Sequence, residues 1–165
     1  MVRIGEMEKK KMWKKKVIKM LENEKNMCLE KIFTKEKGRG VKTNKDIVKG
    51  ECVIEYFGEL ISVKEAKLRE EIYINKNMTE SYTMYFKYKE KTWAIDAQSE
   101  KNETMGRLIN HSKKRNNLNP IVFEHNGVPK VIMIANKDIP KNSELLYDYG
   151  ENRKDIIDNN CWLKD

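Results

Sequence analysis

Four short segments of this 165-residue chain combine tyrosine, histidine, asparagine and glycine in patterns that suit a chemical site. Tyrosine hydroxyls can orient a polar reactant, aromatic faces attract cations, and glycine lets the backbone approach a ligand closely. Each segment alone also has an ordinary interpretation, as a tight turn, a capped turn or part of the core. The segments are Lys37-Gly38-Arg39-Gly40, Glu55-Tyr56-Phe57-Gly58, Arg107-Leu108-Ile109-Asn110-His111-Ser112 and Tyr147-Asp148-Tyr149-Gly150.

In this order and with this spacing, the four segments resemble the SET-domain protein-lysine methyltransferases. The resemblance extends from about Lys37 to Gly150. The end of the chain, Cys161-Trp162-Leu163-Lys164, continues it toward the histone H4 monomethyltransferases that act on the twentieth residue of H4. The resemblance implies that S-adenosylmethionine is the cofactor, that S-adenosylhomocysteine is the product, and that a lysine side chain is the methyl acceptor.

Methyl transfer to a lysine amine requires the neutral amine, although free lysine has a pKa of about 10.4. A narrow, dry channel lowers that pKa because desolvation disfavours the ammonium form. Aromatic walls with hydroxyl groups suit such a channel, so several tyrosines that converge on one site make chemical sense. Holding the two reactants in line can lower the barrier by a further ~7–11 kcal/mol.

The resemblance also implies roles for individual residues. Tyr149 is similar to the central tyrosine at the point of methyl transfer, Tyr56 to a channel tyrosine that binds the amine, and Tyr85 to a further channel aromatic. Tyr147 matches the position at which tyrosine or phenylalanine sets the number of methyl groups, and a tyrosine there implies monomethylation. The implied cofactor contacts are Lys37, Gly38, Arg39, Tyr82, Asn110, His111 and Trp162, the last as a cover for the adenine.

The elements that must position these residues are short strands between turns. The Asn126-Gly127 pair predicts a type I′ hairpin turn. Apolar residues at spacings of three and four (Trp13, Val17, Met20 and Leu21) predict a helix with one apolar stripe over residues 6–25. Helical composition predicts further helices over residues 63–76 and 153–160. The fold class is therefore mostly β, of the α+β kind. The resemblance implies several small β-sheets with a knot-like C-terminal segment, flanked by N- and C-terminal helices. Apolar and aromatic runs predict strands over residues 27–33, 41–44, 52–57, 81–88, 92–97, 122–125, 131–135 and 145–149.

Charge is distributed unevenly along the chain. Residues 1–31 hold ten Lys/Arg and five Glu, a net charge of +5 within a total of +8. We therefore expect a basic helical extension over residues 1–31, a SET catalytic domain over 32–150, and a helical tail over 151–165 that closes the cofactor site. The extension is either a solvated lysine-rich helix or a contact for a polyanion. Lysine supplies 28 of the 34 cations, so a nucleic-acid contact would be to phosphates.

Composition excludes several other classes of protein. The three cysteines are far apart in sequence and odd in number, which argues against a disulfide framework and favours a reducing compartment. Neither a CxxC pair nor a mixed Cys/His cluster is present, so we expect no metal site. No apolar stretch approaches the ~20 residues that span a bilayer, so we expect no membrane contact.

The sequence thus predicts a histone-lysine methyltransferase that monomethylates histone H4 at its twentieth residue in nucleosomes. We expect it to act as a monomer in the nucleus, associated with chromatin. One alternative is a lysine methyltransferase for a non-histone substrate. A second is a catalytically idle chromatin-binding module that uses only the basic helix.

Overall fold

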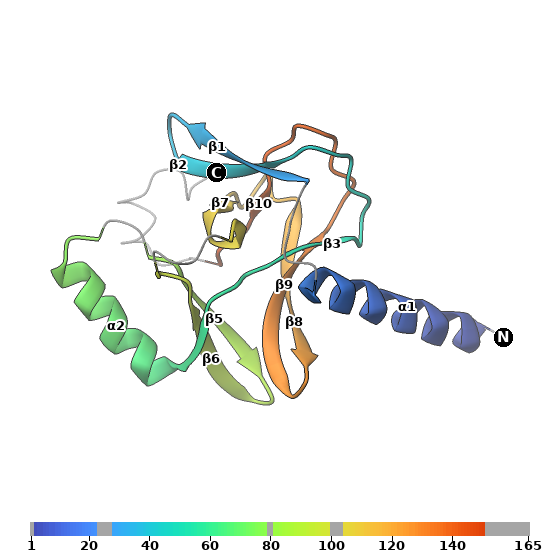
Figure 1. Cartoon of the computed structure of the whole chain (residues 1–165), viewed down its shortest axis with the longest axis horizontal. Helices are drawn as coiled ribbons and strands as arrows, with labels where there is room; N and C mark the ends of the chain where they lie inside the picture. Colours follow the sequence, from blue (N-terminus) through green and yellow to red (C-terminus); the bar gives the residue numbers. More distant parts are fainter. Residues whose placement is uncertain (1, 23–27, 79–80, 100–103, 151–165) are drawn as a thin grey trace.

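Ten strands and two α-helices make up the described part of the chain, which in this computed structural model comprises residues 2–22, 28–78, 81–99 and 104–150. The strands form three sheets, ordered β1-β2, β3-β9-β8-β10-β7 and β4-β6-β5. Figure 1 shows the latter two sheets side by side, with the β1-β2 ribbon beyond one end. The elements are α1 (Val2–Glu22), β1 (Leu29–Thr34), β2 (Gly38–Thr43), β3 (Cys52–Glu55), β4 (Glu59–Ser62), α2 (Val63–Asn75), β5 (Thr83–Tyr88), β6 (Lys91–Asp96), the 3-10 turn η1 (Gly106–Leu108), β7 (Asn110–His111), β8 (Leu118–His125), β9 (Val128–Ala135) and β10 (Leu146–Tyr147).

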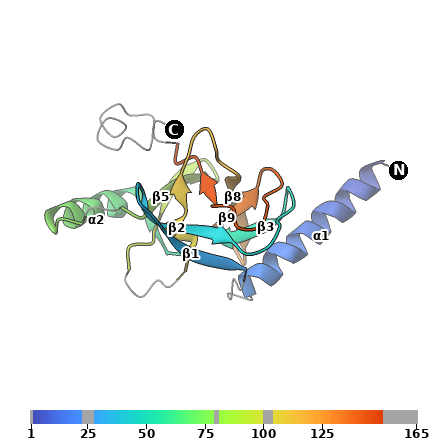
Figure 2. The same ribbon diagram turned by 90° about the horizontal axis from the view of Figure 1, so that it is seen from above.

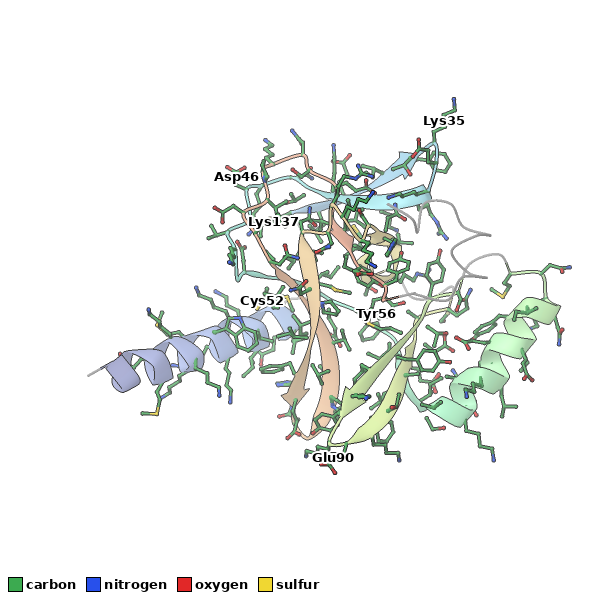
Figure 3. The ribbon with its side chains drawn as sticks, turned by 180° about the vertical axis from the view of Figure 1, so that it is seen from behind. Lys35, Asp46, Cys52, Tyr56, Glu90 and Lys137 are labelled. Atoms are coloured by element: carbon green, nitrogen blue, oxygen red, sulfur yellow. The ribbon has the colours of Figure 1, made fainter. Side chains whose placement is uncertain are left out.

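The main core fills the space between the sheets. It is built from branched aliphatic side chains of the strands, such as Val41, Ile54 and Val131, together with Tyr56 and Tyr147. Figure 3 shows Tyr56 between the five-stranded and the three-stranded sheet. Two prospective site tyrosines are thus part of the hydrophobic core.

Two hairpins give the fold much of its regularity. The β8–β9 hairpin turns at Asn126 and Gly127, whose φ angles of 50° and 76° match the predicted type I′ turn. Both of its strands run eight residues, longer than predicted. The β5–β6 hairpin turns at Lys89 and Glu90, which also have positive φ although neither is glycine or asparagine.

The two helices lie at opposite ends of the molecule (Figure 2). On α1, Val17 is fully buried against Phe123 and Ile132, and Trp13 meets the Phe123 ring edge-on. This apolar stripe had been predicted from the spacing of residues in the 6–25 segment. On α2, the Ser62 side chain caps the first turn by accepting a hydrogen bond from the Glu65 amide.

The C-terminal described segment runs between elements that are distant in sequence. Strand β10 pairs in parallel with both β7 and β8, and the Leu145 amide donates to the Val41 carbonyl of β2. The mostly-β, several-sheet prediction is therefore confirmed. Strands β4 and β7 were not predicted, and the strand predicted over residues 52–57 ends at Glu55. The predicted helix over 153–160 lies outside the described residues.

Candidate active site

Three tyrosines and one histidine form a cluster around β7 and β10. His111 lies on β7, Tyr147 on β10 and Tyr149 just after it, whereas Tyr56 follows β3, the opposite edge strand of the same sheet, and interacts electrostatically with both of the other tyrosines. The rings of Tyr147 and Tyr149 lie 4.7 Å apart, and the Tyr149 ring lies edge-on to His111 at 5.0 Å. The Tyr149 hydroxyl donates to the Ile109 carbonyl at 2.8 Å, which fixes that ring. Tyr56 and Tyr147 are almost fully buried, whereas Tyr149 is partly exposed. The cluster thus extends from the core to the surface.

Burial shapes the acid–base behaviour of the two inner tyrosines. Desolvation, reinforced by Tyr149 and Tyr82, raises the pKa of Tyr56 far above its ordinary value. Desolvation, with Tyr149 and Tyr56 as secondary causes, likewise raises the pKa of Tyr147. Both hydroxyls therefore keep their protons at neutral pH and can donate as well as accept hydrogen bonds.

His111 links the tyrosine cluster to the N-terminal glycine turn. Its carbonyl accepts a hydrogen bond from Lys37 Nζ at 2.9 Å. Its ring Nδ1 accepts one from the Tyr149 amide at 3.0 Å. Because Nδ1 is an acceptor, this arrangement requires the neutral imidazole with its proton on Nε2. One buried residue thus ties Lys37 and Tyr149 together across the fold.

A second group of cofactor candidates gathers around Tyr82. Arg39 Nη2 donates to the Tyr82 hydroxyl at 2.6 Å. The guanidinium of Arg107 lies 5.0 Å from the centre of the Tyr82 ring and donates to the carbonyls of Ala97 and Ser99. This arrangement places two guanidinium groups against one aromatic side chain.

Asn110 lies on the other side of the glycine turn. Its Nδ2 donates to Glu144 Oε1 at 3.0 Å. A Cβ atom on Gly40 would come within 2.8 Å of that Asn110 nitrogen and 3.0 Å of the Glu144 oxygen. Only glycine lets β2 pass so close to this pair. Gly38 has a φ of 70° at the start of the same strand, and a Cβ there would meet nothing within 4 Å.

One predicted site residue, Tyr85, is not brought to this cluster. Tyr85 projects from the face of β5 opposite Met84 and Phe86, which pack on the core, and its hydroxyl donates to Glu70 of α2 at 2.8 Å. Trp162 lies outside the described residues. The structure places the other described site candidates in three neighbouring groups. They are the tyrosine cluster (Tyr56, Tyr147, Tyr149, His111 and Lys37), the Tyr82 group (Tyr82 and Arg39), and the glycine turn with Asn110 (Gly38 and Asn110).

Sequence reasoning did not single out Arg107 or Glu144. Arg107 is the first residue of one of the four motifs, but no role was predicted for it. Glu144 directly precedes the Leu-Leu-Tyr run. Both are charged residues next to buried segments, which is a usable signal because such charges are rarely left unpaired. Among the described residues, no group of three metal-ligating side chains is present, and no helix is long and apolar enough to cross a membrane.

Comparison with known proteins identifies the family. Residues 38–150 match the SET domain. The chain belongs to the SET-domain family. Within that family, N-lysine methyltransferase KMT5A of Xenopus tropicalis is 40% identical over 151 residues, which cover 92% of this chain and 44% of the relative. Histone-lysine N-methyltransferase set-1 of Caenorhabditis elegans is 42% identical over 127 residues, which cover 77% of this chain and 52% of the relative.

A solved SET-domain structure supports the same conclusion. The crystal structure of CpSET8 from Cryptosporidium superimposes with a TM-score of 0.71 at 39% identity, over 76% of this chain and 59% of that one. This SET-domain chain therefore spans about half the length of the curated relatives that it matches.

Proposed function

We propose that this chain is an S-adenosylmethionine-dependent protein-lysine N-methyltransferase. The observation that carries the proposal is the convergence of Tyr56, Tyr147 and Tyr149 beside His111 in a SET-domain chain. Supporting it, the relatives compared above are named as N-lysine or histone-lysine methyltransferases. The family membership thus agrees with the chemistry that the tyrosines can perform.

The residues around the glycine turn fit the proposed cofactor. Lys37 and Arg39 supply positive charge for its carboxylate, and the open space over Gly38 allows close backbone approach. The Tyr82 face suits a planar or cationic group. We assign cofactor binding to these four residues, to Asn110 and His111, and to Trp162 as the adenine cover. When bound, S-adenosylmethionine supplies the methyl group.

The tyrosine cluster would prepare the acceptor lysine. A lysine side chain that enters between Tyr56, Tyr147 and Tyr149 loses water, which lowers its pKa and favours the neutral amine. The Tyr56 hydroxyl, which keeps its proton, can orient the nitrogen lone pair. Tyr149, fixed through Ile109 and His111, would define the line of approach. Tyr85, whose hydroxyl donates to Glu70, remains a proposed channel aromatic.

For the substrate, we propose histone H4 at its twentieth residue, in nucleosomes, with one methyl group added. The Caenorhabditis elegans relative is named a histone-lysine N-methyltransferase, which supports a histone substrate and a nuclear, chromatin-associated role. The monomethyl assignment rests on a tyrosine at position 147, whose hydroxyl would restrict the space beside the acceptor amine and so crowd out a second methyl group. A monomeric enzyme remains our expectation.

The test is transfer of labelled methyl from S-adenosylmethionine to nucleosomes, followed by mass-spectrometric mapping of the product. We expect monomethyl lysine on H4, and we expect Tyr149→Ala to abolish transfer while Tyr88→Phe does not. Intact cofactor binding without any transfer would refute the enzymatic proposal. Transfer to peptides unrelated to histones, with none to H4, would instead favour the non-histone alternative.

We also propose that α1 contacts nucleosomal DNA phosphates. One end of α1 meets the five-stranded sheet (Figure 1). Its buried stripe packs on side chains of β8 and β9, and its lysines are exposed. Because Val17 is part of the core, deleting residues 1–25 would also expose Phe123 and Ile132. Replacing Lys10, Lys14 and Lys15 with glutamine is therefore a cleaner test. It should weaken methylation of nucleosomes far more than that of a short H4 peptide. Equal effects on both would mean that the helix is only structural.

A further inference from the structure

The side chain of Asn117 bonds the backbone on two sides of Leu145. Its Nδ2 donates to the Glu144 carbonyl at 2.9 Å, and its Oδ1 accepts from the Leu146 amide at 2.9 Å. The main-chain amide of Asn117 also donates to the Leu146 carbonyl at 2.9 Å. One residue thus satisfies three backbone polar groups of the segment from Glu144 to Leu146.

These bonds act directly before Tyr147. Strand β10 is only two residues long, so it has few ladder bonds of its own. It pairs with Asn110 and His111 of β7 and meets β8 only at Leu118, the residue after Asn117. The Asn117 amide therefore supplies hydrogen bonds that a longer neighbouring strand would otherwise provide.

Asn117 is itself held firmly. Its side chain is nearly buried, and its carbonyl accepts a hydrogen bond from the Asn136 amide at 2.9 Å. The Asn117 side-chain amide, with its donor on the Glu144 carbonyl and its acceptor on the Leu146 amide, holds this backbone in place. It thereby fixes how deeply the next side chain on β10 enters the core. That side chain is Tyr147, whose ring is almost fully buried against Tyr149.

We propose that Asn117 is a positioning residue that fixes the Tyr147 ring and thereby limits the number of methyl groups added. This inference rests on the proposed function, in which the Tyr147 hydroxyl restricts the space beside the acceptor amine. Asn117 does not touch the acceptor itself. It acts through the peptide units between Glu144 and Tyr147.

Two substitutions at Asn117 separate the contributions of its two side-chain hydrogen bonds. Asn117→Ala removes both side-chain bonds and leaves the Leu146 amide and the Glu144 carbonyl without these partners. Asn117→Asp keeps the volume and the acceptor for Leu146, but it places an oxygen against the Glu144 carbonyl. Asn136→Ala is the matched control, because the Asn136 side chain bonds only Asn116 and Asn119 and does not reach β10.

The experiment measures amide hydrogen exchange and product state on the full chain. Asn117→Ala should speed exchange at the Leu146 amide roughly fivefold to tenfold, the factor for loss of about one net hydrogen bond. It should also raise the share of dimethyl product by a similar factor, while Asn136→Ala changes neither. Loss of stability alone would lower the rate without changing the product ratio.

Each outcome decides a separate point. A folded Asn117→Ala variant with unchanged Leu146 exchange or an unchanged product ratio would overturn the inference. If the alanine variant does not fold, Asn117→Asp decides by the same two readouts. If the unmodified chain transfers no methyl group, the proposed function fails. The positioning role is then judged by exchange alone, where unchanged protection would overturn it.

Discussion

Replacing Arg69 with methionine removes one guanidinium that serves three carboxylates. Arg69 of α2 donates to Glu59 at 2.7 Å, to Glu65 at 2.9 Å and to Asp96 at 2.9 Å. The carboxylates differ in environment, since the side chains of Glu59 and Glu65 are 63% and 47% exposed whereas that of Asp96 is 4% exposed. The methionine retains most of the aliphatic stem, so the variant chiefly tests the charge.

The difference in burial determines the size of the effect. Exposed ion pairs contribute about 0–1 kcal/mol each, because water screens them and both side chains lose entropy. Removing one partner of a buried pair costs about 3–5 kcal/mol, because the other charge remains desolvated. Asp96 keeps bonds from the Tyr73 hydroxyl and the Gln98 amide. We therefore expect Arg69→Met to lower the free energy of unfolding by about 3 kcal/mol at pH 7, nearly all of it through Asp96.

The pH dependence follows from the same carboxylate. Burial alone would raise the pKa of Asp96, but hydrogen bonds from Tyr73, the Gln98 amide and Arg69 outweigh it and lower the pKa. A lowered pKa in the folded state stabilises the protein above the unfolded value of about 3.9. That contribution is lost as the pH falls through the folded pKa. The stability gap between the native chain and Arg69→Met should therefore narrow as the pH falls below about 4.

Urea unfolding at neutral and acid pH measures both effects. Glu65→Gln is the control and should cost less than about 1 kcal/mol. The double variant Arg69→Met/Asp96→Asn should be more stable than Arg69→Met alone, because a neutral amide needs no cation. If the second substitution instead lowers stability further, or Glu65→Gln costs as much as Arg69→Met, the assignment of the energy to a buried Asp96 charge is wrong.

Three other predictions concern single sites. Tyr147→Phe should yield dimethyl product without loss of activity in a mass-spectrometric assay, and a strictly monomethyl product would contradict the proposed role of its hydroxyl. Gly106→Ala should cost about 1–3 kcal/mol in urea unfolding, because its Cβ would lie within 2.4 Å of the Glu55 carbonyl oxygen. Replacing Lys89-Glu90 with Asn-Gly should raise the melting temperature, because both positions have positive φ, and an unchanged or lower value would show that no strain is stored there.

The sequence was most informative where local patterns determine structure. Asn126-Gly127 predicted the hairpin turn because few other dipeptides adopt two positive φ angles easily. The Trp13–Val17 spacing predicted the buried stripe of α1 because a helix repeats every 3.6 residues. The site motifs were found through their joint resemblance to the SET-domain methyltransferases, because each segment alone also has an ordinary interpretation.

What the sequence could not show were contacts between distant residues. Arg69 meets Asp96 from 27 positions away, and no local pattern indicates that pairing. The position of Tyr85 was in principle accessible, since side chains alternate along a strand and Met84 and Phe86 face the core. The similarity to channel aromatics does not by itself indicate on which face of β5 Tyr85 lies.

The ion cluster around Arg69 and the proposed cofactor contact Tyr82 are linked through one carboxylate, that of Asp96. Asp96 Oδ1 accepts from the Gln98 amide, and Gln98 Oε1 accepts from the Tyr82 amide. The Tyr82 carbonyl in turn accepts from the Ala97 amide, so the two segments are bonded in both directions. The group that fastens α2 to β6 therefore also orders the backbone that carries Tyr82. Because Asp96 takes part in both sets of contacts, its buried carboxylate helps to hold the Tyr82 backbone as well as α2.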